Sequence, residues 1–99
     1  MARFDVFRVR DGTGYALDCQ ADVLWQLSTR FCVPLLPRAV APRAGERLNP
    51  SFEVEGEPVI MVTQFAAALS VKELEGPIVN LADQHSAIMD AIDMLTTGY

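Results

Sequence analysis

The chain has 99 residues, of which 51% are hydrophobic and 21% charged, with a formal net charge of −5. This length fits one domain, residues 1–99, and the composition is that of a folded protein rather than a disordered one. The acidic balance argues against direct nucleic-acid binding. No apolar run is long enough to span a bilayer, and the start carries charge at Arg3 and Asp5 where a signal peptide needs an apolar stretch. We therefore expect a cytoplasmic protein that does not enter membranes.

The charge is distributed unevenly along the chain. Residues 1–49 contain seven arginines against five acids, whereas residues 50–99 contain Lys72 alone against eight acids. This asymmetry predicts that the two halves face partners of opposite charge.

Metal and cofactor chemistry has little support in the sequence. The two cysteines, Cys19 and Cys32, form no Cys-x-x-Cys pair, and His85 is the only histidine. We expect no metal site and no cofactor. In a reducing compartment the cysteines are expected to be thiols of the core.

Alternating apolar residues predict two β-hairpins. Residues 4–9 and 15–20 form the first, joined by a turn with two glycines at 11–14. Residues 52–54 and 59–62 form the second, with Gly56 at the turn. Between the hairpins, the run 31–36 predicts a strand that lies at a sheet edge or ends at Pro34, because proline cannot donate to a ladder. Residues 37–47 predict a loop.

The segment 64–79 is ambiguous, since its start suits a helical turn while Leu69 and Val71 suit a strand. Gly76-Pro77 is expected to break whatever precedes it, with one more short strand at 78–79.

The last segment predicts an amphipathic helix. Its apolar stripe consists of Leu81, His85, Ile88, Met89, Ile92 and Leu95. Asp83 is a candidate N-cap, and Gly98 is expected one position past the helix, in left-handed geometry. The sequence as a whole thus predicts a mainly β protein with a C-terminal α-helix.

No catalytic constellation is recognisable. Asp90 and Asp93 are three positions apart and are typical of a solvated helix face, and His85 is expected to pack rather than to act as a general base. A nuclease would need catalytic residues that we do not find. We therefore expect a binding protein, not an enzyme.

Several segments together resemble the CcdB toxin family in order and spacing. They are Arg3-Phe4-Asp5-Val6-Phe7, residues 15–22 (Tyr-Ala-Leu-Asp-Cys-Gln-Ala-Asp), Val33-Pro34-Leu35, Leu48-Asn49-Pro50, Val54-Glu55-Gly56-Glu57 and Ala91-Ile92-Asp93-Met94-Leu95, with Gly98 next to last.

The resemblance implies an SH3-like barrel of antiparallel strands with a C-terminal helix, assembled as a homodimer. It also implies a toxin–antitoxin operon, in which the toxin binds the DNA gyrase A subunit and traps its cleavage complex. A cognate CcdA-like antitoxin neutralises such toxins, and the pair regulates transcription of its operon.

The resemblance implies a topoisomerase-binding surface made of residues from two parts of the chain. These residues are Val23, Leu24, Trp25, Asp93, Thr96, Thr97, Gly98 and Tyr99. The family ends in Trp-Gly-Ile, whereas this chain ends in Thr97-Gly98-Tyr99, so its aromatic anchor is missing. Trp25 stands where the family has a small acid, and its side chain is either half-buried or exposed.

The acidic tail of an antitoxin is expected to meet the arginine-bearing half, at Arg8, Arg10, Arg43 and Arg47, although a merely solvated surface is an alternative. Two other functions stay open. The chain is either a toxin with a different target, such as topoisomerase IV, or a non-poisoning homologue that binds antitoxin and co-regulates its operon.

Overall fold

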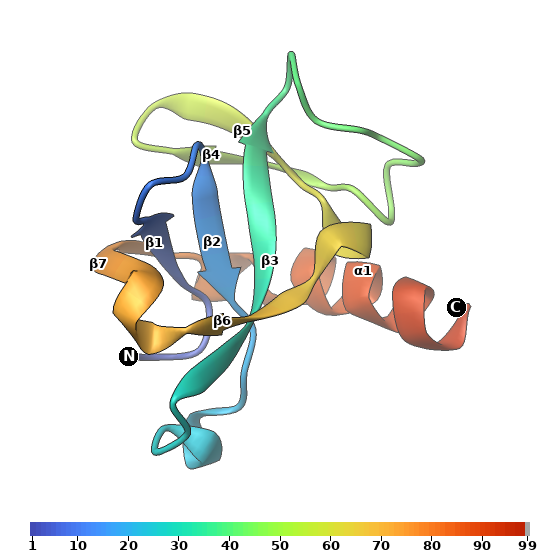
Figure 1. Ribbon diagram of the computed structural model, residues 1–99. Coiled ribbons are helices and arrows are strands. Elements are labelled where there is room, and N and C mark those ends of the chain that lie inside the picture. Colours follow the sequence, from blue (N-terminus) through green and yellow to red (C-terminus); the bar gives the residue numbers. More distant parts are fainter. Residues whose placement is uncertain (99) are drawn as a thin grey trace.

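Seven antiparallel strands form one sheet that curls into a half-barrel (Figure 1). The computed structural model describes residues 1–98. The strands are β1 (Asp5–Val9), β2 (Tyr15–Asp18), β3 (Thr29–Pro37), β4 (Ser51–Val54), β5 (Glu57–Met61), β6 (Ala67–Ser70) and β7 (Leu74–Asn80). Their order is β4-β5-β3-β2-β1-β7, and β6 pairs with the first half of β3. The expected antiparallel barrel architecture is therefore confirmed.

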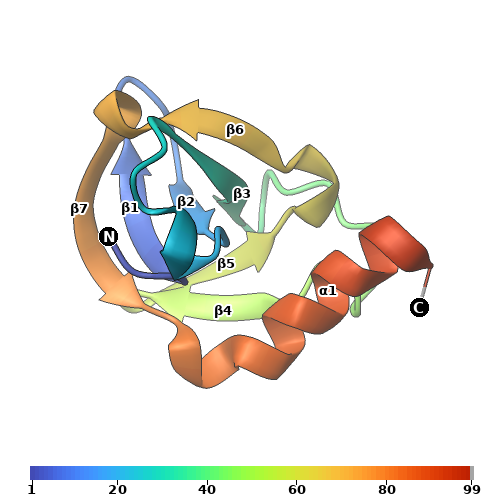
Figure 2. The same ribbon diagram turned by 90° about the horizontal axis from the view of Figure 1, so that it is seen from below.

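One α-helix, α1 (His85–Thr97), follows the strands and lies alongside β4 (Figure 2). Four short 3₁₀ segments connect the strands: η1 (Asp22–Leu24), η2 (Thr63–Phe65), η3 (Val71–Glu73) and η4 (Ala82–Gln84). Within residues 1–98 there is no helix with the length and apolarity needed to cross a membrane.

Both predicted hairpins are present. β1 pairs with β2, with Val6 opposite Leu17, and β4 pairs with β5. Glu55 and Gly56 form the second turn, and both have positive φ, at 53° and 77°. A two-residue turn of this kind matches the right-handed twist of the flanking strands.

The expectation for Pro34 is wrong, because β3 runs through it to Pro37 and lies inside the sheet. The physical reason is that β3 changes partner at this point. Residues 29–32 pair with β6, whereas residues 35–37 pair with β5. The missing N–H of Pro34 therefore falls between two partner strands, while its carbonyl accepts from the Val62 N–H at 2.9 Å.

Gly76-Pro77 likewise does not end an element, because β7 continues through both residues to Asn80. β7 is an edge strand, where a missing N–H is tolerated. Its register against β1 shifts between Val6 and Arg8, which accommodates the interruption. The ambiguous segment 64–79 thus resolves into η2, β6, η3 and most of β7.

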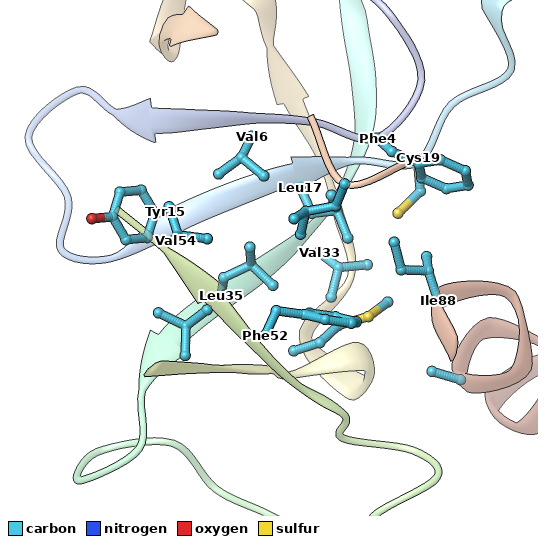
Figure 3. Close-up of a cluster of buried hydrophobic side chains, with 14 residues drawn as sticks. Phe4, Val6, Tyr15, Leu17, Cys19, Val33, Leu35, Phe52, Val54 and Ile88 are labelled. Atoms are coloured by element: carbon cyan, nitrogen blue, oxygen red, sulfur yellow. The ribbon is translucent and has the colours of Figure 1, made fainter. Parts of the chain in front are cut away.

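The core lies between the concave face of the sheet and α1 (Figure 3). Ile88 points from α1 into this cluster and is fully buried, as is Ala91. The predicted stripe is confirmed at its centre, but Leu95 and His85 are exposed. The His85 ring still packs edge-on against Phe4, with centroids 5.5 Å apart. Packing is thus the role that the structure supports for His85.

The ends of α1 differ in how well they were predicted. Asp83 is not the N-cap, because α1 begins at His85 after η4. The position before α1 is Gln84, and the side chain that bonds near the start of η4 is that of Asn80, whose Oδ1 accepts from the Ala82 N–H at 2.8 Å. Gly98 is confirmed one position past the helix, with φ at 83°, and its N–H donates to the Met94 carbonyl.

Both cysteines are buried free thiols, as expected. Burial raises the pKa of Cys19 to about 12, and it raises the pKa of Cys32 to about 12 as well. Both side chains are therefore protonated at neutral pH and behave as small apolar groups of the core.

Replacing Ile88 with Ala should lower the free energy of unfolding by about 2–5 kcal/mol, because it leaves a cavity where α1 meets the sheet. Chemical denaturation followed by circular dichroism measures this loss. Val40→Ala is the matched control, since Val40 is exposed and should change stability by less than about 0.5 kcal/mol. Equal losses in the two variants would show that α1 is not anchored through Ile88.

Candidate binding surface

Residues 21–28 between β2 and β3, which we call the Trp25 loop, carry four exposed large apolar side chains close together in the sequence. Val23 is 82% exposed and Trp25 is 62% exposed, while Leu24 and Leu27 are also exposed. Every residue from 21 to 29 is exposed to solvent. Isolated exposed apolar residues are ordinary, but a contiguous group of them marks an interaction surface.

A hollow of about 680 Å³ opens beside this loop. Its apolar rim is formed by Met1, Trp25, Leu27 and Val71, and Arg30 contributes a charged group to its lining. The Ser28 carbonyl accepts from the Val71 N–H at 3.0 Å, which ties the loop to η3 beside the hollow. The surface therefore extends beyond the three loop residues that the sequence predicted.

Polar side chains from outside the Trp25 loop form hydrogen bonds with its backbone. Gln20 Nε2 donates to the carbonyls of Leu24 and Thr29, each at 3.2 Å, and its Oε1 accepts from the Phe31 N–H. Arg30 Nη2 donates to the Trp25 carbonyl at 3.2 Å. These bonds connect the middle of the loop, at Leu24 and Trp25, to the start of β3.

Arg30 is itself anchored in the protein interior by Asp18. Arg30 is 3% exposed and Asp18 is 1% exposed, and Arg30 Nε lies 3.8 Å from Asp18 Oδ2. Within residues 1–98, Arg30 Nε is a buried atom without a hydrogen-bond partner. Burial raises the pKa of Asp18 above its ordinary value, while the Gln20 N–H and the Arg30 charge oppose this rise. Burying two charges is costly, and the cost is offset only through their mutual attraction and through further hydrogen bonds such as those to Gln20 and Trp25.

The second predicted region lies at the C-terminal end of α1. Asp93, Thr96, Thr97 and Gly98 are all exposed, as are the neighbouring Met94 and Leu95. The Thr96 hydroxyl donates to the Ile92 carbonyl, and the Thr97 hydroxyl donates to the Asp93 carbonyl at 2.7 Å. The threonine hydroxyls therefore bond within their own helix. Tyr99 lies outside the residues that the structure describes.

The two predicted regions are not adjacent in one chain. The Trp25 loop and the C-terminal end of α1 project in different directions in both views (Figures 1 and 2). Arg3 forms a link between the elements that carry them. Its N–H donates to Asp22 Oδ1 at 2.7 Å, and its Nη2 donates to Met89 Sδ at 3.0 Å. The start of the Trp25 loop is thereby tied to the middle of α1.

The four arginines predicted for antitoxin binding also fall into two separate pairs. Arg8 forms an ion pair with Glu55 at 2.6 Å, and Arg10 forms one with Glu75 at 3.5 Å. Arg43 and Arg47 lie exposed on the loop after β3, away from β1 (Figure 1). The structure does not bring the four side chains together.

Asn49 organises the loop that carries Arg43 and Arg47. It is fully buried, and its Oδ1 accepts from the N–H groups of Ala44 and Gly45. Its Nδ2 donates to the Met61 carbonyl and to Gln64 Oε1. Sequence reasoning found Asn49 only as part of a family motif and assigned it no role.

Metal ligation has no support in the part of the chain that the structure describes. Residues 1–98 contain no group of three or more His, Cys, Asp or Glu side chains arranged to hold a metal ion.

A curled antiparallel sheet followed by a single C-terminal helix defines the MazF/CcdB-like class of folds. A family model described as CcdB protein matches residues 3–98, so the chain belongs to the CcdB family. The solved structure of Mycobacterium tuberculosis toxin MazF-mt6 is similar in fold, with a TM-score of 0.74 and 17% sequence identity. The alignment covers 90% of this chain and 92% of that one. Among curated proteins, no sequence matches. Family membership and this fold support a toxin of a toxin–antitoxin system.

Proposed function

We propose that this chain acts in the cytoplasm as a single-domain toxin of a type II toxin–antitoxin system. It binds a bacterial type II topoisomerase, the DNA gyrase A subunit, and traps the cleavage complex by contact rather than by catalysis. The observation that carries this proposal is the exposure of Val23, Leu24 and Trp25 on one loop of a CcdB-family chain. These are loop positions at which the family resemblance implies target contact.

Trp25 is the residue best suited to anchor a partner. Tryptophan brings a large rigid apolar area at a low cost in side-chain entropy, and it is enriched among residues that dominate binding energy. The half-buried alternative for Trp25 is not supported, because its side chain is mostly exposed. In the proposal, Trp25 and Tyr99 together replace the aromatic anchor that Thr97 does not provide.

Replacing Trp25 with Ala should weaken topoisomerase binding by about 30-fold or more, the equivalent of about 2 kcal/mol for one aromatic anchor. Deleting Tyr99 should have a similar effect, whereas Thr97→Trp should strengthen gyrase binding. Surface plasmon resonance with the purified gyrase A catalytic core measures each affinity. Val40→Ala serves as an exposed apolar control that leaves binding unchanged. Normal binding by Trp25→Ala would remove the loop from the interface.

The proposed toxin is a homodimer. Met94 and Leu95 on α1 and Phe65 on η2 are exposed apolar side chains, and these two elements contact each other in the fold. A two-fold pairing through this region would cover them and would place two helix ends side by side. Closed two-fold dimers are the commonest oligomers, and a chain of this size gains stability from one.

Sedimentation at micromolar concentration should therefore give a mass near twice the 10.9 kDa of one chain. Leu95→Lys should shift the equilibrium toward the single chain, because it would bury an unpaired charge at the interface. A wild-type mass of one chain at this concentration would contradict the dimer.

The proposed antitoxin is CcdA-like, and its acidic tail contacts the arginines of the toxin. Through the same contact the toxin joins the complex that regulates transcription of the operon. The geometry favours Arg43 and Arg47 for this role over Arg8 and Arg10. Arg8 and Arg10 already have acidic partners, Glu55 and Glu75, so their charges are partly compensated.

Substituting both Arg43 and Arg47 with Ala should weaken antitoxin binding several-fold at low salt and should flatten its dependence on salt. The matched comparison is Arg8 and Arg10 both changed to Ala, which should have a smaller effect. Titration calorimetry at two ionic strengths measures both quantities. Unchanged affinity of the Arg43/Arg47 variant at low salt would rule out this contact.

A second function is favoured by one observation, the exposed Thr97 at the position where the family has its aromatic anchor. A chain without this anchor would either act on topoisomerase IV or bind its antitoxin without poisoning a topoisomerase. Induction in a bacterial host decides between these possibilities. Growth arrest that a resistant gyrase A allele relieves supports the gyrase toxin, arrest in both strains supports another target, and unimpaired growth supports the non-poisoning homologue.

A further inference from the structure

The Trp25 loop has no buried residue, and its apolar side chains are exposed to water. Every residue from 21 to 29 is exposed, so apolar burial does not hold this loop in place. A loop of this kind ordinarily samples many conformations, because few contacts offset its conformational entropy. Three backbone hydrogen bonds lie within the loop, from the N–H groups of Leu24, Trp25 and Leu27, and its remaining order depends on hydrogen bonds from outside residues 21–29.

Two side chains that flank the loop in the sequence supply three of these bonds, and Arg3 and Val71 supply others through their backbone N–H groups. Gln20 follows β2 and bridges the two arms of the loop, from the Leu24 carbonyl to the Thr29 carbonyl and the Phe31 N–H. Arg30 belongs to β3 and reaches the Trp25 carbonyl. We refer to these two side chains as the Gln20–Arg30 clamp.

The clamp has a rigid base, because Arg30 is held in the interior by Asp18. The Asp18 carbonyl accepts from the Phe4 N–H at 2.6 Å, and its Oδ1 accepts from the Gln20 N–H at 3.0 Å. Asp18 thus contacts both members of the clamp, one through its side-chain charge and the other through a backbone N–H. The ion pair with Asp18 fixes the position of the Arg30 guanidinium, which donates to the Trp25 carbonyl. A flexible charged side chain at the surface would not be held in one position in this way.

We propose that Gln20 and Arg30 are positioning residues, which hold the Trp25 loop in the conformation that binds the topoisomerase. This inference rests on the proposed function, because it assigns the control of that same surface. Neither side chain needs to touch the partner. They order the loop before the partner binds, so that less conformational entropy is lost on binding. Apparent affinity is proportional to the fraction of chains in the binding-competent conformation, and the two side chains raise that fraction.

The chain itself provides a reporter for this proposal, because Trp25 is its only tryptophan. Time-resolved fluorescence anisotropy of the purified toxin follows the mobility of Trp25, and amide hydrogen exchange follows residues 21–29. Topoisomerase affinity is measured on the same samples with the gyrase A catalytic core, and antitoxin affinity is measured as a second binding reaction.

The informative variants are Gln20→Ala and Arg30→Lys. Lysine keeps a positive charge near Asp18, but its single ammonium group cannot lie beside Asp18 and also replace the separate Nη2 that donates to the Trp25 carbonyl. Arg30→Lys is therefore expected to fold, whereas Arg30→Met would leave the Asp18 charge buried and unpaired. The matched controls are Gln84→Ala and Arg38→Lys, which change the same residue types at exposed positions elsewhere.

Both clamp variants should increase Trp25 mobility and speed amide exchange in residues 21–29. They should weaken topoisomerase binding about tenfold if the competent fraction falls to about one tenth. Antitoxin affinity and the melting temperature of Gln20→Ala should stay close to wild type, and both controls should match wild type in every measurement.

Two results would overturn the proposal. One is unchanged mobility of Trp25 in both clamp variants, which would mean that other contacts order the loop. The other is a mobile loop that still binds the topoisomerase with wild-type affinity. Failure of the wild type to bind any type II topoisomerase would instead refute the proposed function, and the mobility measurements would still decide whether the clamp orders the loop.

Discussion

The buried pair of Asp18 and Arg30 connects the interior of the half-barrel to its most exposed segment. Asp18 is the last residue of β2, and Arg30 lies near the start of β3, so the pair sits where the two strands diverge. From that position Arg30 reaches the Trp25 carbonyl, while Asp18 binds the N–H of Gln20. Removing two charges from water has a high cost, which is offset in part by their mutual attraction and by the hydrogen bonds that Arg30 makes to Trp25 and Asp18 makes to Gln20.

Polar side chains hold other parts of the fold in a similar way. Asn49 connects the loop that carries Arg43 and Arg47 to β5, because it bonds to the Ala44 N–H and to the Met61 carbonyl. Arg3 connects the Trp25 loop to α1. A sheet of short strands has limited interior volume, so its long connections lie on the surface. Each surface loop that carries a proposed function is therefore held by a buried or half-buried polar side chain at its base.

Local patterns predicted the hairpins, the amphipathic helix and the left-handed Gly98, because each depends on residues close together in the sequence. They failed at Pro34 and Gly76-Pro77, where the outcome depends on which strands lie alongside. Local patterns also failed at Asp83, because this residue lies inside η4 and the N-cap position of α1 is Gln84. For the candidate binding surface, the family resemblance indicated Val23, Leu24 and Trp25. It did not indicate Gln20 and Arg30, because these residues bond to backbone carbonyls that come within reach only when the loop is folded. No sequence spacing marks such a contact.

The pairing of β1 with β7 brings Asp5 opposite Asn80, 75 positions later in the sequence. The β1–β2 hairpin can form from neighbouring residues, but this long-range pairing cannot begin until both strands are available, and Ile88, which completes the core, comes later still. A nascent chain that has reached only β6 therefore lacks β7 and α1, and it leaves the apolar face of its sheet uncovered. Such a chain can reach its packed state only after residues 74–97 have left the ribosome.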